Sequence, residues 1–177
     1  KRETSDMSNQ FSKIHPELQQ AAKMSPTFTA SRKNLWFIRS LMFLMPPQKI
    51  PNDILVENIH IPGQDGRTKI RLRTYKPKSI SAPIPVLLWL HGGGYVIGRP
   101  EMDDRSCIEY VRELGIMVVS VDYRCAPKHP FPAALDDCTA ALRWVASQAG
   151  QFGIDARRIA IGGESAGGGL AAALAQL

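Results

Sequence analysis

The sequence of 177 residues has little cysteine and no long uninterrupted apolar run. Its three cysteines are an odd number without the spacing of metal ligands, which favours neither a disulfide framework nor a metal site. The most apolar stretch, residues 35–45, is interrupted by Arg39 and Ser40 and is too short to cross a bilayer. No secretory signal is seen at the start, so a cytoplasmic location with no transmembrane segment is the simpler expectation.

The sequence also lacks a concentrated patch of basic residues. Lys and Arg number 22 against 16 Asp and Glu, which gives a net charge of +6, but the basic residues are scattered. The densest group, at positions 67, 69, 71 and 73, alternates along the chain and predicts the solvated face of a strand. Nucleic-acid binding is therefore not expected. A hydrophobic share of 44% with 21% charged residues is ordinary for a soluble globular domain.

Residues 1–47 differ in character from the rest and are predicted to be helical. A short helix over 17–22 can start from Pro16, and a second candidate over 31–45 ends at a pair of prolines. The second helix has almost no polar face, so something must cover it. Two explanations stay open at this stage: packing on a neighbouring domain, or a lid over an apolar substrate site, with or without contact to a membrane surface.

From residue 48 onward the pattern predicts an α/β domain. Residues 54–61 and 68–75 alternate in polarity around Asp65-Gly66, which predicts a hairpin. Continuous apolar runs at 85–90, 116–121 and 159–161 are typical of parallel strands that are covered on both faces. Helical periodicity between these runs completes a doubly wound, mostly parallel sheet.

A glycine-rich serine motif, Gly163-Glu164-Ser165-Ala166-Gly167, follows the last apolar run. It reads as a strand, a sharp turn and a helix, a setting in which a strained serine has its hydroxyl pushed clear of the backbone. The glycines on either side let the strand and the helix approach closely. The alternative is a glycine- and serine-rich turn before an alanine-rich core helix, and the motif alone does not decide between them.

A second glycine turn, His91-Gly92-Gly93-Gly94-Tyr95, follows the first buried strand. Its backbone N–H groups can turn toward a ligand at the edge where open α/β sheets bind substrates. In acyl transfer such donors stabilise the developing oxyanion by about 3 to 4 kcal/mol each. Two glycine N–H groups and the N–H after the serine would supply three donors.

Together these motifs resemble the hormone-sensitive lipase-like branch of the α/β-hydrolase carboxylesterases. A third segment, residues 122–134, is similar to that family's run after a strand, with Cys125 and Lys128 as departures. The resemblance covers nearly the whole chain and implies a helical cap segment over 1–47 and the N-terminal part of a catalytic domain over 48–177. We interpret the third segment as structural.

The resemblance also implies roles for individual residues. Ser165 resembles the nucleophile, and Gly93, Gly94 and Ala166 resemble the donors of the oxyanion hole. The supporting residues of the motifs are His91, which orders the loop, together with Gly92 and Glu164. No cofactor and no metal is needed for this chemistry.

A triad serine needs an imidazole base and a carboxylate that orients it. After Ser165 the chain contains no histidine and no acidic residue. In the family's strand order the run at 159–161 is interior, which here would leave an unpaired apolar edge. We therefore expect residues 1–177 to be part of a longer polypeptide whose remainder supplies the Asp and the His.

The resulting hypothesis is a serine esterase that hydrolyses short- to medium-chain acyl esters through an acyl-enzyme on Ser165. An alternative is a receptor-like protein of the same fold that binds a small ligand without catalysis, and a third is an inactive fragment. A homodimer is compatible with all three. Sequence beyond Leu177 would separate these hypotheses.

Overall fold

The computed structural model describes residues 13–24, 34–44, 48–80 and 83–177. The chain divides into two compact units, Lys1–Asn34 and Leu35–Leu177. The first unit contributes helix α2 (Pro16–Met24), which starts at the predicted proline and buries none of its residues. The second unit holds the sheet and the candidate site. The functional division into a cap segment 1–47 and a catalytic part 48–177 stays a prediction.

A five-stranded mixed sheet in the order β1-β2-β4-β3-β5 forms the centre of the second unit. The hairpin predicted around Gly66 pairs β1 with β2 in antiparallel register, and β2 continues antiparallel onto β4. The three continuous apolar runs form the parallel part, in which β3 pairs with β4 on one side and β5 on the other. The strands are β1 (Ile54–Pro62), β2 (Lys69–Pro77), β3 (Ile84–Leu90), β4 (Met117–Asp122) and β5 (Ile154–Gly163).

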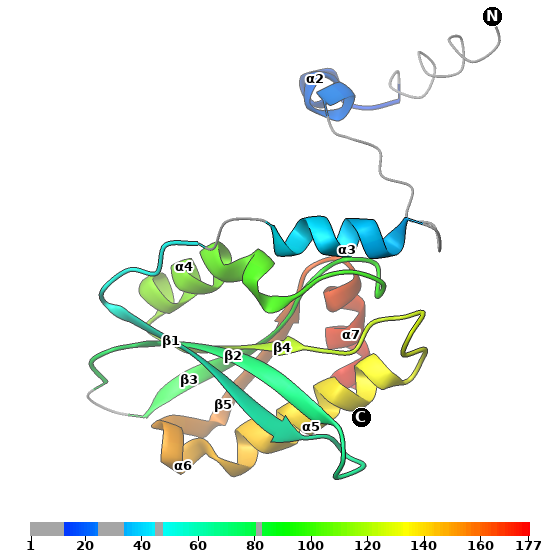
Figure 1. Ribbon diagram of the computed structural model, residues 1–177. Coiled ribbons are helices and arrows are strands. Elements are labelled where there is room, and N and C mark those ends of the chain that lie inside the picture. The colour runs from blue at the N-terminus through cyan, green and yellow to red at the C-terminus, as the bar shows by residue number, and fades with distance from the viewer. Residues whose placement is uncertain (1–12, 25–33, 45–47, 81–82) are drawn as a thin grey trace, which may run out of the picture. The chain divides into compact units, whose positions relative to one another are not determined.

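Helices cover both faces of this sheet, as the continuous apolar runs predict (Figure 1). Helices α5 and α7 pack on one face around Leu88, Val119 and Leu170, and α4 packs on the other around Val111 and Val118. Strand β5 is the last strand in the sheet order, and its Ala160 is exposed. The elements between and beside the strands are η1 (Pro100–Asp103), α4 (Asp104–Leu114), α5 (Ala133–Ser147), α6 (Ala149–Phe152) and α7 (Ala166–Leu174).

Helix α4 ends where the sequence predicts. Gly115 adopts the left-handed conformation at φ 63°, and its N–H donates to Val111 O. A residue without a Cβ takes this conformation at little cost, so the helix stops and the chain turns into β4. The 3₁₀ helix η1 before α4 has no counterpart in the sequence interpretation.

Helix α3 (Leu35–Phe43) lies inside the predicted range 31–45, of which residues 31–33 and 45 are outside the described parts. Leu35 is buried, whereas Trp36 is 69% exposed and Phe37 57% exposed. The apolar helix is thus only partly covered by the unit to which it belongs.

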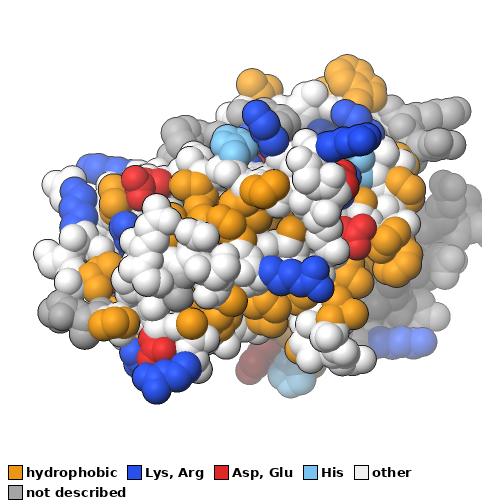
Figure 2. All heavy atoms as spheres, turned by 90° about the horizontal axis from the view of Figure 1, so that it is seen from below, with side chains coloured by type: hydrophobic (Ala, Val, Ile, Leu, Met, Phe, Trp, Pro, Cys, Tyr) orange, Lys and Arg blue, Asp and Glu red, His pale blue; other side chains and the backbone are white. Residues whose placement is uncertain are grey.

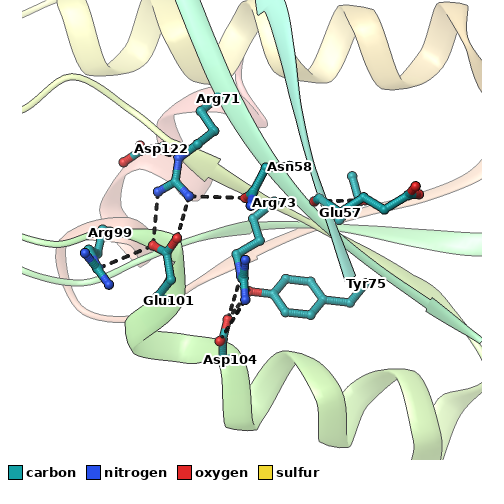
Figure 3. A network of polar contacts seen from close by, with 10 residues as sticks. Glu57, Asn58, Arg71, Arg73, Tyr75, Arg99, Glu101, Asp104 and Asp122 are labelled. Atoms are coloured by element: carbon teal, nitrogen blue, oxygen red, sulfur yellow. Dashed lines mark hydrogen bonds and ion pairs between the residues drawn. The ribbon is translucent and has the colours of Figure 1, made fainter. Parts of the chain in front are cut away.

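The sequence interpretation of the alternating basic residues on β2 is wrong for Arg71 and Arg73. Their side chains are only 22% and 12% exposed, because η1 and α4 cover this face of the strand (Figure 3). Arg71 binds Glu101 through both terminal nitrogens and donates from Nε to Asp122 at 2.9 Å. Burial works to raise the pKa of Glu101, but the hydrogen bonds from Arg71 hold it at about 2.

The second arginine of this face forms a buried pair. Arg73 donates from Nε and Nη2 to the two carboxylate oxygens of Asp104 at 2.8 and 3.0 Å, and the Tyr75 hydroxyl donates to the same carboxylate at 2.6 Å. Asp104 is 1% exposed. These charges therefore tie β2 to the start of α4 and are not available to a polyanion.

Elsewhere on the surface the Lys and Arg side chains are scattered between hydrophobic and other side chains, as the face in Figure 2 shows. In the described ranges, no helix combines the length and the apolar character that crossing a bilayer requires.

Candidate active site

Ser165 occupies a strained turn between β5 and α7. Strand β5 ends at Gly163, helix α7 begins at Ala166, and Ser165 between them has φ 51° and ψ −114°. A positive φ is costly for a residue with a Cβ and persists only where the surroundings enforce it. The side chain of Ser165 is exposed, whereas Ala166 behind it is buried. The hydroxyl thus stands clear of the backbone at the start of a helix.

The flanking glycines permit the close contact that this turn needs. A Cβ built on Gly163 would lie 2.5 Å from the carbonyl oxygen of Gly167 and 2.7 Å from that of Leu90. A Cβ on Gly167 would overlap the Leu90 carbonyl outright. Since Leu90 ends β3, helix α7 packs directly on the backbone of two neighbouring strands.

Replacing Gly167 by alanine should therefore damage both stability and activity. The added methyl group has to push α7 away from Leu90, and overpacking of this kind costs about 1 to 3 kcal/mol. Urea denaturation of the full-length protein measures the loss, and the ester hydrolysis that the resemblance implies should fall at least tenfold because Ser165 moves with the helix. Gly150→Ala is the matched control, since a Cβ there meets no atom within 4 Å. Equal stability of the two variants would contradict the close contact.

The glycine turn after β3 lies beside this elbow. A Cβ built on Gly92 would be 3.3 Å from Glu164 O and 3.6 Å from Ser165 Cβ. Gly93 and Gly94 have φ values of 119° and 61°, which favour glycine. The structure thus brings the two glycine motifs of the sequence together at the same ends of β3 and β5.

Hydrogen bonds orient the N–H groups of this turn. In a planar trans peptide, the C=O of one residue and the N–H of the next point in opposite directions. His91 Nδ1 donates to Gly92 O at 2.8 Å, and the Val96 and Ile97 N–H groups donate to Gly93 O at 3.1 and 3.0 Å. The N–H groups of Gly93 and Gly94 therefore point away from these partners. Over the described ranges, no protein group accepts a hydrogen bond from Gly93, Gly94 or Ala166 N–H.

His91 lies under the turn and not in the open site. It is fully buried and stacks on Tyr123 with ring centroids 4.1 Å apart, and the Tyr123 hydroxyl donates to His91 O at 2.6 Å. Burial lowers the pKa of His91, so the ring is neutral. Its Nε2 has no partner within the described parts of the chain. This environment fits a residue that orders the loop.

Glu164 reaches the site mainly through its backbone. Its N–H donates to Leu90 O at 3.1 Å, its carbonyl accepts from Gly167 N–H at 2.8 Å, and its side chain is exposed. These contacts fix the elbow on the end of β3.

Comparison with known proteins places the chain in a family. A family model described as alpha/beta hydrolase fold matches residues 87–177. The chain belongs to this family. It is 42% identical over 132 residues to the carboxylesterase NlhH of Mycobacterium tuberculosis, an alignment that covers 75% of this chain and 41% of that protein. It is 40% identical over 122 residues to an ethyl acetate hydrolase of Pseudomonas putida, covering 68% of this chain and 38% of that protein.

Solved structures agree with these relatives. A bacterial heroin esterase superposes with a TM-score of 0.80 at 38% identity, over 94% of this chain and 53% of that one. The resemblance to carboxylesterases stated from the motifs is confirmed, and so is the α/β-hydrolase fold. This alpha/beta hydrolase chain spans about two fifths of the length of these curated relatives and about half that of the solved structure.

A cavity of about 410 Å³ lies against helix α7 of this alpha/beta hydrolase. It is lined on one side by Gly169, Leu170 and Ala173, and on another by Tyr95 and Phe131. A further cavity of about 290 Å³ is lined by Arg39 and Met42 of α3 together with Ile97 and Tyr123. Both cavities therefore border the glycine turn or the segment that follows β4.

The segment 122–134, interpreted as structural, contacts helix α5 through Arg124 and lines the cavity against α7 through Phe131. The Arg124 backbone N–H donates to Asp137 of α5 at 2.9 Å, and its guanidinium donates to the same carboxylate, which is 1% exposed. Cys125, a departure from the family pattern, is a half-buried thiol whose pKa is raised by burial to about 11. It is therefore a thiol and not a nucleophilic thiolate at neutral pH.

The sequence interpretation gave no role in the site to two residues that lie near it. Tyr95 has φ 62°, and its hydroxyl oxygen lies against Gly169 of α7, where an added Cβ would be 2.5 Å away. Arg39 reaches across to the glycine turn from α3. The only sequence signal for Arg39 was a single cation that interrupts an apolar run.

Proposed function

We propose that the full-length protein is a serine carboxylesterase with Ser165 as its nucleophile. The observation that carries the proposal is an exposed serine held at φ 51° beside a turn whose glycine N–H groups have no protein acceptor within the described residues. Such a pair supplies the attacking oxygen and the donors for the negative charge that develops in acyl transfer. Relatives named carboxylesterase and ethyl acetate hydrolase support the same chemistry.

In the proposed reaction, Ser165 Oγ attacks the ester carbonyl carbon while its proton passes to an imidazole base. The carbonyl oxygen becomes an oxyanion and accepts hydrogen bonds from the N–H groups of Gly93, Gly94 and Ala166. The C–O bond to the alcohol then breaks, the alcohol leaves with the proton, and an acyl-enzyme remains. Water attacks the acyl carbon and gives a proton to the same base. The bond to Oγ then breaks, the base returns the proton to Ser165 Oγ, and the acid is released.

We propose that the base and its orienting carboxylate lie outside residues 1–177. His91 does not suit this role, because it is fully buried with Nδ1 on Gly92 O, and burial keeps its ring neutral. Residues 166–177 contain no histidine and no acidic side chain. The proposal therefore concerns the whole protein, to which this chain contributes the nucleophile and the oxyanion donors.

Short- to medium-chain acyl esters are the proposed substrates. The cavity of about 410 Å³ between Tyr95 and α7 is mostly lined by apolar side chains, and its size falls in the range of small-molecule sites. The arrangement of Arg39 and Met42 along the second cavity supports a role for α3 as part of the roof over the substrate.

The test is hydrolysis of a series of p-nitrophenyl esters, from acetate through butyrate and octanoate to palmitate, by the full-length protein. We expect kcat/KM to be greatest for butyrate or octanoate and at least tenfold lower for palmitate, because a cavity of this size cannot enclose a long acyl chain. A protein that binds these esters without releasing p-nitrophenol would be a receptor-like ligand binder, and the proposal would be wrong.

A further inference from the structure

Arg39 of helix α3 binds two backbone carbonyls that are far from it in sequence. Its Nε and Nη2 donate to Val96 O at 3.1 and 2.6 Å, and Nη2 also donates to Ala126 O at 2.8 Å. Hydrogen bonds from a charged donor are about twice as strong as neutral ones, and these are partly buried. A single side chain thus joins α3, the glycine turn and the segment after β4.

The two carbonyls belong to residues whose own N–H groups hold the glycine turn. Val96 N–H donates to Gly93 O at 3.1 Å, so the residue that Arg39 binds is also the one that closes the turn. Ala126 N–H donates to Tyr95 O at 2.8 Å, which fixes the neighbouring peptide. Ile97 N–H, in the same peptide as the Val96 carbonyl, also donates to Gly93 O at 3.0 Å. Moving this peptide would loosen both contacts on Gly93 O and with them the direction of the Gly94 N–H.

Tyr95, between these contacts, is held in an unfavourable backbone conformation. Its φ of 62° costs free energy for a residue with a Cβ and needs contacts on both sides to persist. The contacts are Ala126 N–H on Tyr95 O and Arg39 on Val96 O. Its side chain then reaches Gly169 on α7, four residues after Ser165. The position of the turn relative to the elbow therefore depends on contacts in which Arg39 takes part.

We propose that Arg39 is a positioning residue for ester hydrolysis, which holds the Gly93 and Gly94 donors at the right place relative to Ser165. Among the described residues, the hydrogen bonds of Arg39 all go to backbone carbonyls, through which it acts. This inference rests on the proposed esterase function. The inference gives α3 a second role besides covering the substrate. The helix carries the arginine that positions the oxyanion donors.

The test is steady-state hydrolysis of p-nitrophenyl butyrate by full-length Arg39→Gln and Arg39→Lys variants. A shift of about 1 Å in a catalytic group can reduce the rate about 100-fold, so we expect Arg39→Gln to lower kcat about 10- to 100-fold with KM within about twofold. Arg39→Lys keeps the charge but lacks the planar guanidinium that reaches two carbonyls. Its kcat should therefore lie between those of the wild type and of Arg39→Gln. Ser40→Ala on the same helix and the exposed Arg105→Gln are controls that should stay near wild type.

A second readout separates positioning from a general loss of structure. A trifluoromethyl ketone forms an oxyanion on the nucleophile, so its affinity should weaken by the same factor as kcat/KM in Arg39→Gln. The affinity of an unreactive amide analogue of the substrate should change less than twofold. In the same variant, amide hydrogen exchange of the peptide 91–98 should be at least tenfold faster, while exchange in β3 stays unchanged.

Each outcome decides the inference. Selective loss of kcat and of ketone affinity, with faster exchange at 91–98, supports it. Arg39→Gln with wild-type kcat, with an effect on KM alone, or with equal losses of ketone and amide affinity overturns it while the esterase function stands. Absence of hydrolysis by the wild type, or hydrolysis by Ser165→Ala at the wild-type rate, refutes the proposed function and the role of Arg39 with it.

Discussion

Replacing Ser165 by alanine should abolish ester hydrolysis by the full-length protein. Loss of the nucleophile in a serine hydrolase lowers kcat by about 10⁴- to 10⁶-fold, because the residual rate comes only from the oxyanion donors and substrate binding. The side chain is exposed, so its removal should leave the free energy of unfolding nearly unchanged. Release of p-nitrophenol from a butyrate ester measures the rate, and urea denaturation measures the stability.

Ser147→Ala is the matched control for this variant. Ser147 is the last residue of α5, and its exposed hydroxyl donates to Trp144 O at 2.8 Å. The same chemical change at this site should leave kcat/KM within about twofold of wild type. Retention of more than a tenth of the wild-type rate in Ser165→Ala would show that another group is the nucleophile.

The largest effect on stability is expected from breaking the buried ion pair between Arg73 of β2 and Asp104 of α4. Changing Asp104 to alanine would leave Arg73, whose side chain is 12% exposed, without its counter-charge, and the Tyr75 hydroxyl without its acceptor. Breaking one side of a buried ion pair costs about 3 to 5 kcal/mol, far more than the net value of the intact pair. Urea denaturation of the full-length protein should show this loss.

Two further variants test whether the loss of stability comes from an uncompensated buried charge. Asp53→Ala breaks the exposed pair with Arg112, where solvent screens both charges, and should change stability much less. The double variant Arg73→Met/Asp104→Leu removes both charges and should recover most of the loss. If the double variant is as unstable as Asp104→Ala, the penalty is not that of an uncompensated charge.

The sequence predicts the fold well because its signals are local. The alternation at 54–61 and 68–75 gives the hairpin, and the continuous apolar runs give the parallel strands β3, β4 and β5. Gly163 and Gly167 predict the close contact of β5 and α7 for the same reason. Only a residue without a Cβ fits at these two positions, so the signal lies in single residues. Strand ends differ from the predicted ones by few residues, except for β5, which starts at Ile154.

Long-range polar contacts could not be predicted in the same way. The basic residues of β2 alternate as on a solvated strand, but η1 and α4, about 30 residues further along the chain, bring Glu101 and Asp104 over them. Arg39 similarly finds its acceptors 57 and 87 residues away. Which charges meet depends on how the elements pack, and periodicity carries no information on that.

Helix α3 shows the limit of an argument from amphipathicity. Its sequence predicts a helix that must be covered, yet Trp36 and Phe37 are exposed on the unit that carries them. The residue with the clearest structural task is the arginine that breaks its apolar pattern. An exception in a sequence pattern was here more informative than the pattern itself.

Labelling by a fluorophosphonate tests the central claim most directly. The reagent reacts with an activated serine and adds its phosphonyl group to Oγ, and peptide mass spectrometry of the full-length protein identifies the modified residue. The account predicts a single adduct on Ser165 that forms in parallel with loss of esterase activity and is absent from Ser165→Ala. An adduct on another residue, or complete inactivation with Ser165 unmodified, would contradict it.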